Sequence, residues 1–284
     1  MTQYTRVQLP TRAFSFEFFP PKTEAGIERL RATRKQLAQL MPTFFSVTFG
    51  AGGSTRERTL ETVLEIQANG SSAAPHVSCV GSSEESIRSV LQRYQERGIR
   101  HIVALRGDLP SGTVDVGAFR YASELVGFIR RETGSHFTIE VAAYPEVHPQ
   151  ARSSQESLVH FKQKIDAGAN AAITQFFYNA DAYFEFVDAC GAAGITVPIV
   201  PGVMPINNFS QLARFADNCG AEIPRWIRMK MQGYGDDTAS IKAFGLDLVT
   251  DLCDRLLTSG APGLHFYTLN QAGPACTIWQ RLGL

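Results

Sequence analysis

The stretch Phe14-Ser15-Phe16-Glu17-Phe18-Phe19-Pro20-Pro21 opens the pattern that decides the fold. Six residues come first, four of them phenylalanines with high strand propensity, and two prolines then end the strand because proline has no N–H to donate to a sheet. Residues 24–40 follow with the spacing of an amphipathic helix, and a second apolar run occupies 43–49. A strand, a helix and another strand at this spacing predict a βαβ unit with parallel strands.

This unit repeats along the chain, and glycines 98, 168 and 194 close helices in it. We expect strands at 13–19, 43–49, 75–80, 100–106, 137–144, 170–177, 196–203 and 263–268. Helices are expected at 24–40, 54–69, 83–97, 117–133, 153–167, 180–193, 208–219 and 237–259. Eight strands, each with a helix nearby, predict an α/β fold with a single (β/α)8 TIM barrel over residues 1–284, because no Ser/Gly-rich linker divides the chain. An open parallel sheet is the alternative.

The composition disfavours several classes of protein. Lys+Arg and Asp+Glu both total 27, so no overall field attracts nucleic acid or an anionic membrane. The five cysteines form no CxxC pair and are odd in number, which argues against a disulfide framework and a zinc site. The chain shows no apolar leader segment and no run of about 18 apolar residues. We therefore expect a cytoplasmic protein without nucleic-acid or membrane partners.

Glu17 is a carboxylate inside an aromatic strand. Alternation places Phe14, Phe16 and Phe18 on one face, and puts Glu17 on the other face with its neighbours Ser15 and Phe19. Water-poor surroundings raise the pKa of a carboxyl group, which suits a general acid near neutral pH. A structural pair with a buried Arg or Lys is an equally good interpretation.

Polar residues gather where the predicted strands end, and barrels of this kind build their sites at that rim. Any one of these residues could be a cap or a solvated side chain, but their convergence predicts a site. The set is Glu17, Thr48, His76, Arg106-Gly107-Asp108, Tyr144 and Gln175.

Other motifs keep two interpretations each. The run 50–54 resembles a phosphate cradle but lacks GxGxxG and the P-loop ending, so it suits a tight turn. Residues 106–108 offer a cation, a close backbone approach and a carboxylate for a phosphate and a nitrogen-rich ring, or form a structural Arg–Asp pair. The face with Arg152, His160 and Lys164 is solvated or binds an anionic tail. The histidines lack metal-ligand spacing, so no metal is expected.

Eight segments together resemble the methylenetetrahydrofolate reductase family in its short bacterial form, over nearly the whole chain and in the right order. The matching segments are residues 14–22, 46–55, 74–76, 100–110, 141–149, 166–170, 173–177 and 265–270.

The resemblance implies a barrel that binds FAD noncovalently. It implies a ping-pong reaction in which NADH or NADPH reduces the flavin and leaves. The substrate 5,10-methylenetetrahydrofolate then takes the place of the dinucleotide at one shared site. The folate leaves as 5-methyltetrahydrofolate, which feeds methionine synthesis, and family members form homo-oligomers. The flavin supplies the hydride chemistry and the protein supplies position and electrostatics.

The resemblance also assigns roles to individual positions. Glu17 matches the general acid that protonates N10 of the folate, and Asp108 matches a catalytic carboxylate near the flavin pyrimidine and the pterin. Flavin-contacting positions are matched by Thr48, His76, Arg106, Gly107, Asp108, Tyr121, Ala122, Tyr144, His148, Ala151 and Lys164. Substrate-contacting positions are matched by Glu17, Asp108, Gln175, Gln211 and Phe215.

The chain departs from the family pattern at three positions. Gln271 stands where some relatives carry Arg, Ser157 where an acid occurs, and Phe49 where Tyr is frequent. None of these positions carries the reaction. Two rival functions are a pterin-binding methyltransferase barrel without flavin, and a folate-binding or scaffold protein without catalysis.

Overall fold

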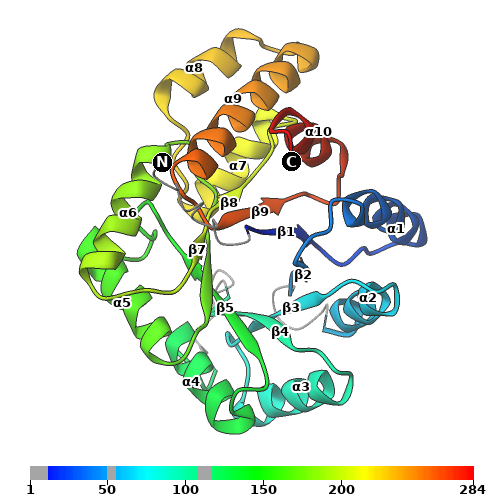
Figure 1. Ribbon diagram of the computed structural model, residues 1–284, viewed down its shortest axis with the longest axis vertical. Helices are drawn as coiled ribbons and strands as arrows, with labels where there is room; N and C mark the ends of the chain where they lie inside the picture. Colours follow the sequence, from blue (N-terminus) through cyan, green and yellow to red (C-terminus); the bar gives the residue numbers. More distant parts are fainter. Residues whose placement is uncertain (1–11, 50–55, 108–116) are drawn as a thin grey trace, which may run out of the picture.

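The structure is a computed structural model that describes residues 12–49, 56–107 and 117–284. In these ranges, parallel strands form a central ring and helices lie around its outside (Figure 1). The strands are β1 (Ala13–Phe18), β2 (Phe44–Val47), β3 (Ala73–Ser78), β4 (His101–Leu105), β5 (Thr138–Ala143), β6 (Ala171–Thr174), β7 (Ile199–Val200), β8 (Gly202–Val203) and β9 (Gly263–Tyr267). The helices are α1 (Glu24–Ala38), α2 (Arg56–Ala68), α3 (Glu84–Glu96), α4 (Ala122–Thr133), α5 (Ser154–Asp166), α6 (Ala180–Ala192), α7 (Phe209–Cys219), α8 (Arg225–Gly233), α9 (Thr238–Thr258) and α10 (Gly273–Arg281).

The sheet closes through one interrupted strand. Its order is β7-β6-β5-β4-β3-β2-β1-β9-β8, so β7 and β8 form its two edges. Pro201 alone separates these two edges along the chain, and its carbonyl accepts a hydrogen bond from His265 N–H at 3.0 Å. Because proline cannot donate to a sheet, the strand divides at this residue. The predicted (β/α)8 barrel is confirmed, with the strand expected at 196–203 present as two short pieces.

Most predicted elements occur within a few residues of their expected bounds. The glycines at 98, 168 and 194 have φ of 71°, 113° and 76°, as expected for residues that close helices. The helix expected at 117–133 begins only at Ala122. Two helices were not predicted, α8 and α10. Proline precedes α8 at 224 and lies in the first turn of α10 at 274, a start signal that could have located both.

Two cores flank the strands. Between sheet and helices, Phe16 packs against Phe45 and Phe266 with ring centroids 6.0 and 5.4 Å away. Inside the barrel, a smaller apolar cluster contains Phe44, Ala74, Val103 and Ile173. Buried polar side chains also occur on the inward positions of the strands, which is unusual for an interior and marks a site. They are Ser15, Ser46, His76, Glu140 and His265.

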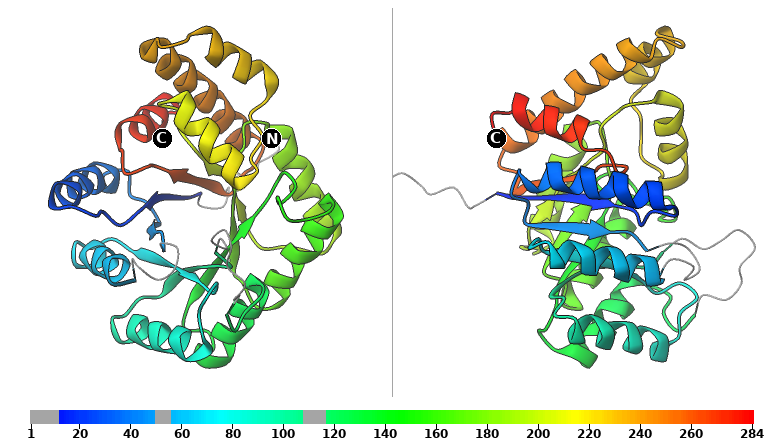
Figure 2. Two further views of the ribbon diagram at one scale, coloured as in Figure 1. Left: turned by 180° about the vertical axis from the view of Figure 1, so that it is seen from behind. Right: turned by 90° about the vertical axis from the view of Figure 1, so that its right-hand side faces the viewer.

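The strands run in one direction, so their carboxyl ends lie together at one end of the barrel, as the side view in Figure 2 shows. Parallel strands connected by helices require this arrangement. Among the described residues, no helix combines the length and apolar character needed to cross a bilayer.

Candidate active site

Glu17 lies on the inner face of β1 between two imidazoles. Its Oε2 is 3.3 Å from His76 Nε2 on β3 and 3.7 Å from His265 Nε2 on β9. The carboxylate side chain is 19% exposed, against 9% and 1% for the two histidine side chains. The predicted alternation is confirmed, because Phe16 and Phe18 are fully buried on the opposite, helix-facing side. The interpretation as a pair with Arg or Lys is wrong in its partner, since the basic side chains that the structure describes beside Glu17 are histidines.

The histidines reverse the expected effect of burial on Glu17. Burial raises the pKa of this carboxyl group, but its close contacts with His265 and His76 outweigh burial and lower the pKa to about 2. The expectation of a raised pKa is therefore wrong. Residues 14–19 alone could not reveal partners that the closed barrel brings from β3 and β9.

Both Nε2 atoms are buried and have no hydrogen bond of good geometry to a described residue. At 3.3 and 3.7 Å their contacts with Glu17 are looser than an ordinary hydrogen bond of about 2.9 Å. Catalytic hydrogen bonds are often long before the ligand arrives and tighten when it binds. The two imidazoles therefore lie close to the carboxylate without an ordinary hydrogen bond to it.

The segment after β9 is fastened to the end of β1. Thr268 Oγ1 donates to Glu17 O at 2.6 Å, and Asn270 exchanges two hydrogen bonds with the backbone of Phe19 at 2.9 and 3.0 Å. Leu269 and Asn270 have φ of 50° and 58°, a conformation that Asn tolerates better than Leu. This connection fixes the height of Glu17 at the barrel mouth.

Three residues of this centre were not assigned a site role from the sequence. Ser15 Oγ is 2.7 Å from His265 Nδ1, and Tyr267 O–H donates to Thr174 O at 2.8 Å. Alternation along 263–268 places His265 and Tyr267 on one face, which was the available signal. Gly202 leaves room for the Tyr267 ring, because a Cβ there would lie 2.6 Å from Tyr267 Cε2.

Lys164 provides a buried cation near the strand ends. Its Nζ donates to Ala142 O, and burial lowers the pKa of the ammonium group to about 8. The solvated-face interpretation is therefore wrong for Lys164, although Arg152 on the same helix region is exposed. A buried ammonium with no ion pair to a described carboxylate suits an anionic ligand.

The loop after β5 gathers several predicted flavin-contacting residues. Tyr144 and His148 pack edge to face with ring centroids 4.4 Å apart, and Ala151 N–H donates to His148 O at 2.8 Å. Arg106 Nη1 reaches this loop by donating to Gln150 Oε1 at 2.5 Å. Residues 106, 144, 148 and 151 therefore belong to one wall of the barrel mouth.

Gly107 suits a close backbone approach, as its motif predicted. Its φ is 88°, and a Cβ would overlap Ser78 Oγ. Asp108 lies outside the described residues, as does the run 50–55, so both interpretations of the 106–108 motif stay predictions.

Two further cofactor positions lie at neighbouring elements. Tyr121, just before Ala122 and α4, stacks on His160 of α5 with ring centroids 5.4 Å apart. Thr48 follows β2, where its N–H donates to Phe18 O at 2.9 Å. Thr48 therefore lies beside the end of the strand that carries Glu17.

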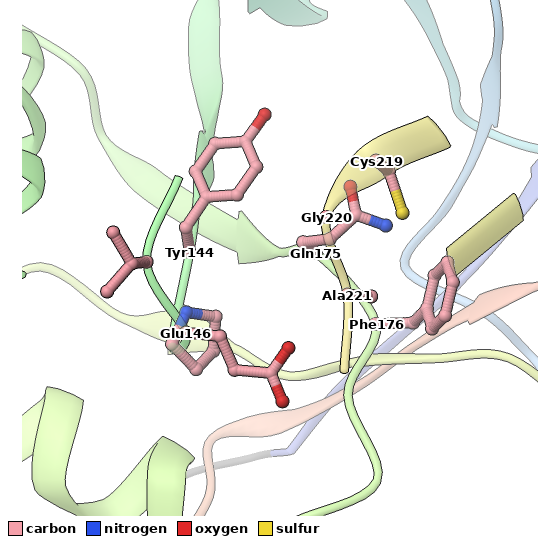
Figure 3. A pocket seen from close by; sticks show the side chains of 9 residues that line it. Tyr144, Glu146, Gln175, Phe176, Cys219, Gly220 and Ala221 are labelled. Atoms are coloured by element: carbon pink, nitrogen blue, oxygen red, sulfur yellow. The ribbon is translucent and has the colours of Figure 1, made fainter. Parts of the chain in front are cut away.

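A surface pocket lies between the loop after β5, the loop after β6 and the end of α7 (Figure 3). Tyr144 and Glu146 form one wall, and Phe176 and Cys219 lie across from them. Glu146 Oε2 accepts the Glu222 N–H at 2.7 Å, and burial raises the pKa of this carboxyl group.

The substrate positions are only partly brought together. Gln175 lines this pocket, whereas Gln211 and Phe215 lie on α7 outside its lining. Gln211 N–H donates to Asn208 Oδ1 at 2.8 Å and so begins that helix, and Phe215 packs on the core.

The three departures from the family pattern have ordinary environments. Gln271 Oε1 accepts from Asn207 Nδ2 at 3.2 Å, and the Phe49 ring lies 5.5 Å from the Arg56 guanidinium. Ser157 is half-buried on α5. None of these contacts involves Glu17.

Comparison with known proteins supplies the context for this geometry. The family model described as methylenetetrahydrofolate reductase matches residues 5–283. A 5,10-methylenetetrahydrofolate reductase of Pectobacterium carotovorum is 45% identical, covering 95% of this chain and 90% of that protein. The Escherichia coli protein of the same name is 43% identical with the same coverage. An uncharacterized protein from Clostridium thermocellum that binds two copies of 5-methyl-5,6,7,8-tetrahydrofolic acid has a similar fold, with a TM-score of 0.65 at 15% identity, over 92% of this chain and 90% of that one.

Proposed function

Because this chain belongs to the methylenetetrahydrofolate reductase family, we propose that it reduces 5,10-methylenetetrahydrofolate to 5-methyltetrahydrofolate with electrons from NADH or NADPH. In this proposal the electrons pass through noncovalently bound FAD in a ping-pong order, and the product supplies methyl groups for methionine synthesis. We also propose a cytoplasmic homo-oligomer whose subunits are single catalytic barrels.

Two cationic side chains and a close backbone approach at the barrel mouth support the proposal of FAD binding. Lys164 holds a buried ammonium group without a described carboxylate partner, as a site for an anionic ligand would. Arg106 adds a second cation, and Gly107 permits close backbone approach. The remaining cofactor positions would surround the group: Thr48, His76, Asp108, Tyr121, Ala122, Tyr144, His148 and Ala151. Bound FAD would supply hydride transfer from the dinucleotide to the folate.

The chain's own chemistry concerns the proton. Glu17 would give a proton to N10 of the folate while the bond from N10 to the methylene carbon breaks and its electron pair stays on N10. The resulting iminium carbon is then open to hydride. Asp108, Gln175, Gln211 and Phe215 would orient the pterin and hold the substrate. The observation that carries this proposal is Glu17 Oε2 at 3.3 and 3.7 Å from two buried imidazoles at the carboxyl end of a barrel.

Anaerobic stopped-flow measurement of the two half-reactions tests the function. Wild-type protein should be yellow, lose its flavin absorbance with NADH or NADPH, and regain it with methylenetetrahydrofolate. Glu17→Gln should keep the first half-reaction and slow the second by about 10²-fold or more, because general acid catalysis contributes on that order. Glu28→Gln, which changes an exposed glutamate on α1, is the matched control and should behave as wild type.

Three outcomes contradict the proposal. A colourless protein that takes up no flavin favours a methyltransferase-like barrel. Full reductase activity in Glu17→Gln, or an equal loss in both half-reactions, removes the acid role. Binding of folate without any turnover favours a non-catalytic folate-binding protein.

A further inference from the structure

His265 is the middle member of a buried line of three residues. Its Nδ1 is 2.7 Å from Ser15 Oγ, and its Nε2 is 3.7 Å from Glu17 Oε2. The pairing of β1 with β9 fixes this line, because Ser15 is opposite His265 and Glu17 is opposite Tyr267. His265 is 0% exposed and Ser15 is 3% exposed. Its burial leaves the imidazole in contact with Glu17 rather than with solvent.

We propose that His265, oriented by Ser15, is a positioning residue that holds the proton which Glu17 delivers to N10 of the folate. This inference rests on the proposed function and adds to it the source of the proton.

The serine hydroxyl can follow the imidazole through both of its states. A hydroxyl both donates and accepts, whereas each imidazole nitrogen does one or the other according to its proton. In the imidazolium state, Nδ1–H donates to Ser15 Oγ and Nε2–H faces the Glu17 carboxylate. Transfer of the Nε2 proton leaves a neutral imidazole that keeps Nδ1–H, and a neutral Glu17 acid.

The proton balance of the whole step is simple. Glu17 passes the same proton to N10 as the bond from N10 to the methylene carbon breaks, and the bonding pair becomes the lone pair of the protonated amine. One proton has then moved from the His265 imidazolium to the folate, and Glu17 is again a carboxylate. After the product leaves, solvent returns a proton to His265 by way of Glu17, whose side chain is 19% exposed.

A carboxylate alone is a poor proton reservoir at neutral pH, while an imidazole is the side chain best suited to that task. The buried Nε2 of His265 has no hydrogen bond of good geometry to another described group, so its proton has one described destination within 4 Å, Glu17. A purely structural histidine would instead have both nitrogens bonded.

Other titratable groups share this interior. His76 contacts the same Glu17 oxygen from β3, and Tyr267 packs edge to face on His265 with centroids 5.2 Å apart. The Phe44 ring separates His265 from His101, with centroids at 6.2 and 4.1 Å. Beyond it, His101 Nε2 pairs with Glu140 Oε1 at 3.0 Å. This second pair is therefore insulated from the Glu17 cluster and provides a control.

The test follows the rate of the folate half-reaction from pH 5 to pH 9 by anaerobic stopped flow on the flavin-loaded protein. In His265→Gln, an amide replaces Nε2 but carries no transferable proton. We expect a loss of about 10- to 100-fold at pH 7.5, within the range for one acid–base group. The midpoint at which the rate falls with rising pH should move to lower pH by about one unit or more, towards carboxyl titration. The NAD(P)H half-reaction should change less than about twofold, and His101→Gln should leave the midpoint unchanged.

Ser15→Ala gives a second, smaller perturbation that keeps the imidazole. Loss of one buried hydrogen bond predicts a folate half-reaction about 3- to 10-fold slower. In a protein that already carries His265→Gln, adding Ser15→Ala should slow the folate half-reaction by less than about twofold, because the hydroxyl acts through the histidine. Equal costs in both backgrounds, or an unmoved pH midpoint in His265→Gln, would overturn the inference. Wild-type protein unable to reduce methylenetetrahydrofolate would instead reject the proposed function, so the two failures are distinguishable.

Discussion

Replacing Glu17 with Gln should lower the free energy of unfolding by an amount that depends on pH in a defined way. The folded protein holds the pKa of Glu17 at about 2, against an ordinary value of 4.5. Each pH unit of depression corresponds to about 1.4 kcal/mol, so the charged carboxylate contributes about 3 kcal/mol. Because the pKa is depressed, this stability is present above about pH 4.5 and is lost as the pH falls towards 2.

Gln has the shape of the protonated acid and so serves as the uncharged reference. We expect Glu17→Gln to be less stable than wild type by about 3 kcal/mol at pH 6, and by about 1.5 kcal/mol at pH 3, from the same linkage relation. Urea unfolding followed by circular dichroism at these pH values measures this difference.

The exposed Glu28→Gln variant is the control, because its partner Arg31 is on the surface and such pairs contribute about 0–1 kcal/mol. A difference between wild type and Glu17→Gln that is below about 1 kcal/mol at pH 6, or that stays constant down to pH 3, would refute the reasoning. Either result would mean that the two histidines do not stabilise the carboxylate.

Two further predictions concern the cation and the close packing at the barrel mouth. Lys164→Met should weaken FAD binding by about 10-fold or more in a flavin titration. It should also raise the stability of the flavin-free protein at pH 7 by about 1–2 kcal/mol, because burial disfavours the ammonium and lowers its pKa to about 8. Unchanged flavin affinity would remove the cation from the cofactor site. Gly202→Ala should cost about 1–3 kcal/mol, because the added Cβ would overlap the Thr174 carbonyl oxygen and the Tyr267 ring. Gly191→Ala in α6, where a Cβ has no neighbour within 4 Å, should be neutral or slightly stabilising in the same thermal melts, and equal effects would contradict the packing argument.

Local patterns predicted the barrel because each element of this fold has its own signal. Alternation gave the strand that carries Glu17 and the face on which that residue lies, and glycines with positive φ gave three helix ends. The division of one expected strand into β7 and β8 at Pro201 was not predicted. The run 196–203 is apolar apart from Thr196 and Gly202, so it reads as one continuous strand. The helix α8 was missed because it is only nine residues long and three of them are Arg or Lys.

The site was harder to predict than the fold, since its contacts join residues far apart in sequence. The type and face of Glu17 were available from alternation, yet its contact with His76 depends on β1 and β3 both pairing with β2. The partner His265 reaches Glu17 only because β9 pairs with β1 and closes the ring. Burial was correctly expected for the carboxylate, but the sign of its pKa change came from these two distant imidazoles.

That sign constrains how an acid role for Glu17 can work. With a pKa of about 2 beside its two histidines, Glu17 would hold a proton about once in 10⁵ molecules at pH 7. Such rarity corresponds to roughly 7 kcal/mol, which exceeds the roughly 3–5 kcal/mol that a general acid contributes. The interactions that depress the pKa come, however, from the two neighbouring histidines, and they weaken when one of those histidines gives its proton to Glu17. Transfer of a proton from a histidine to Glu17 therefore neutralises both side chains at once. The histidines that lower the pKa of Glu17 are thus also the groups that make the cluster a usable proton donor.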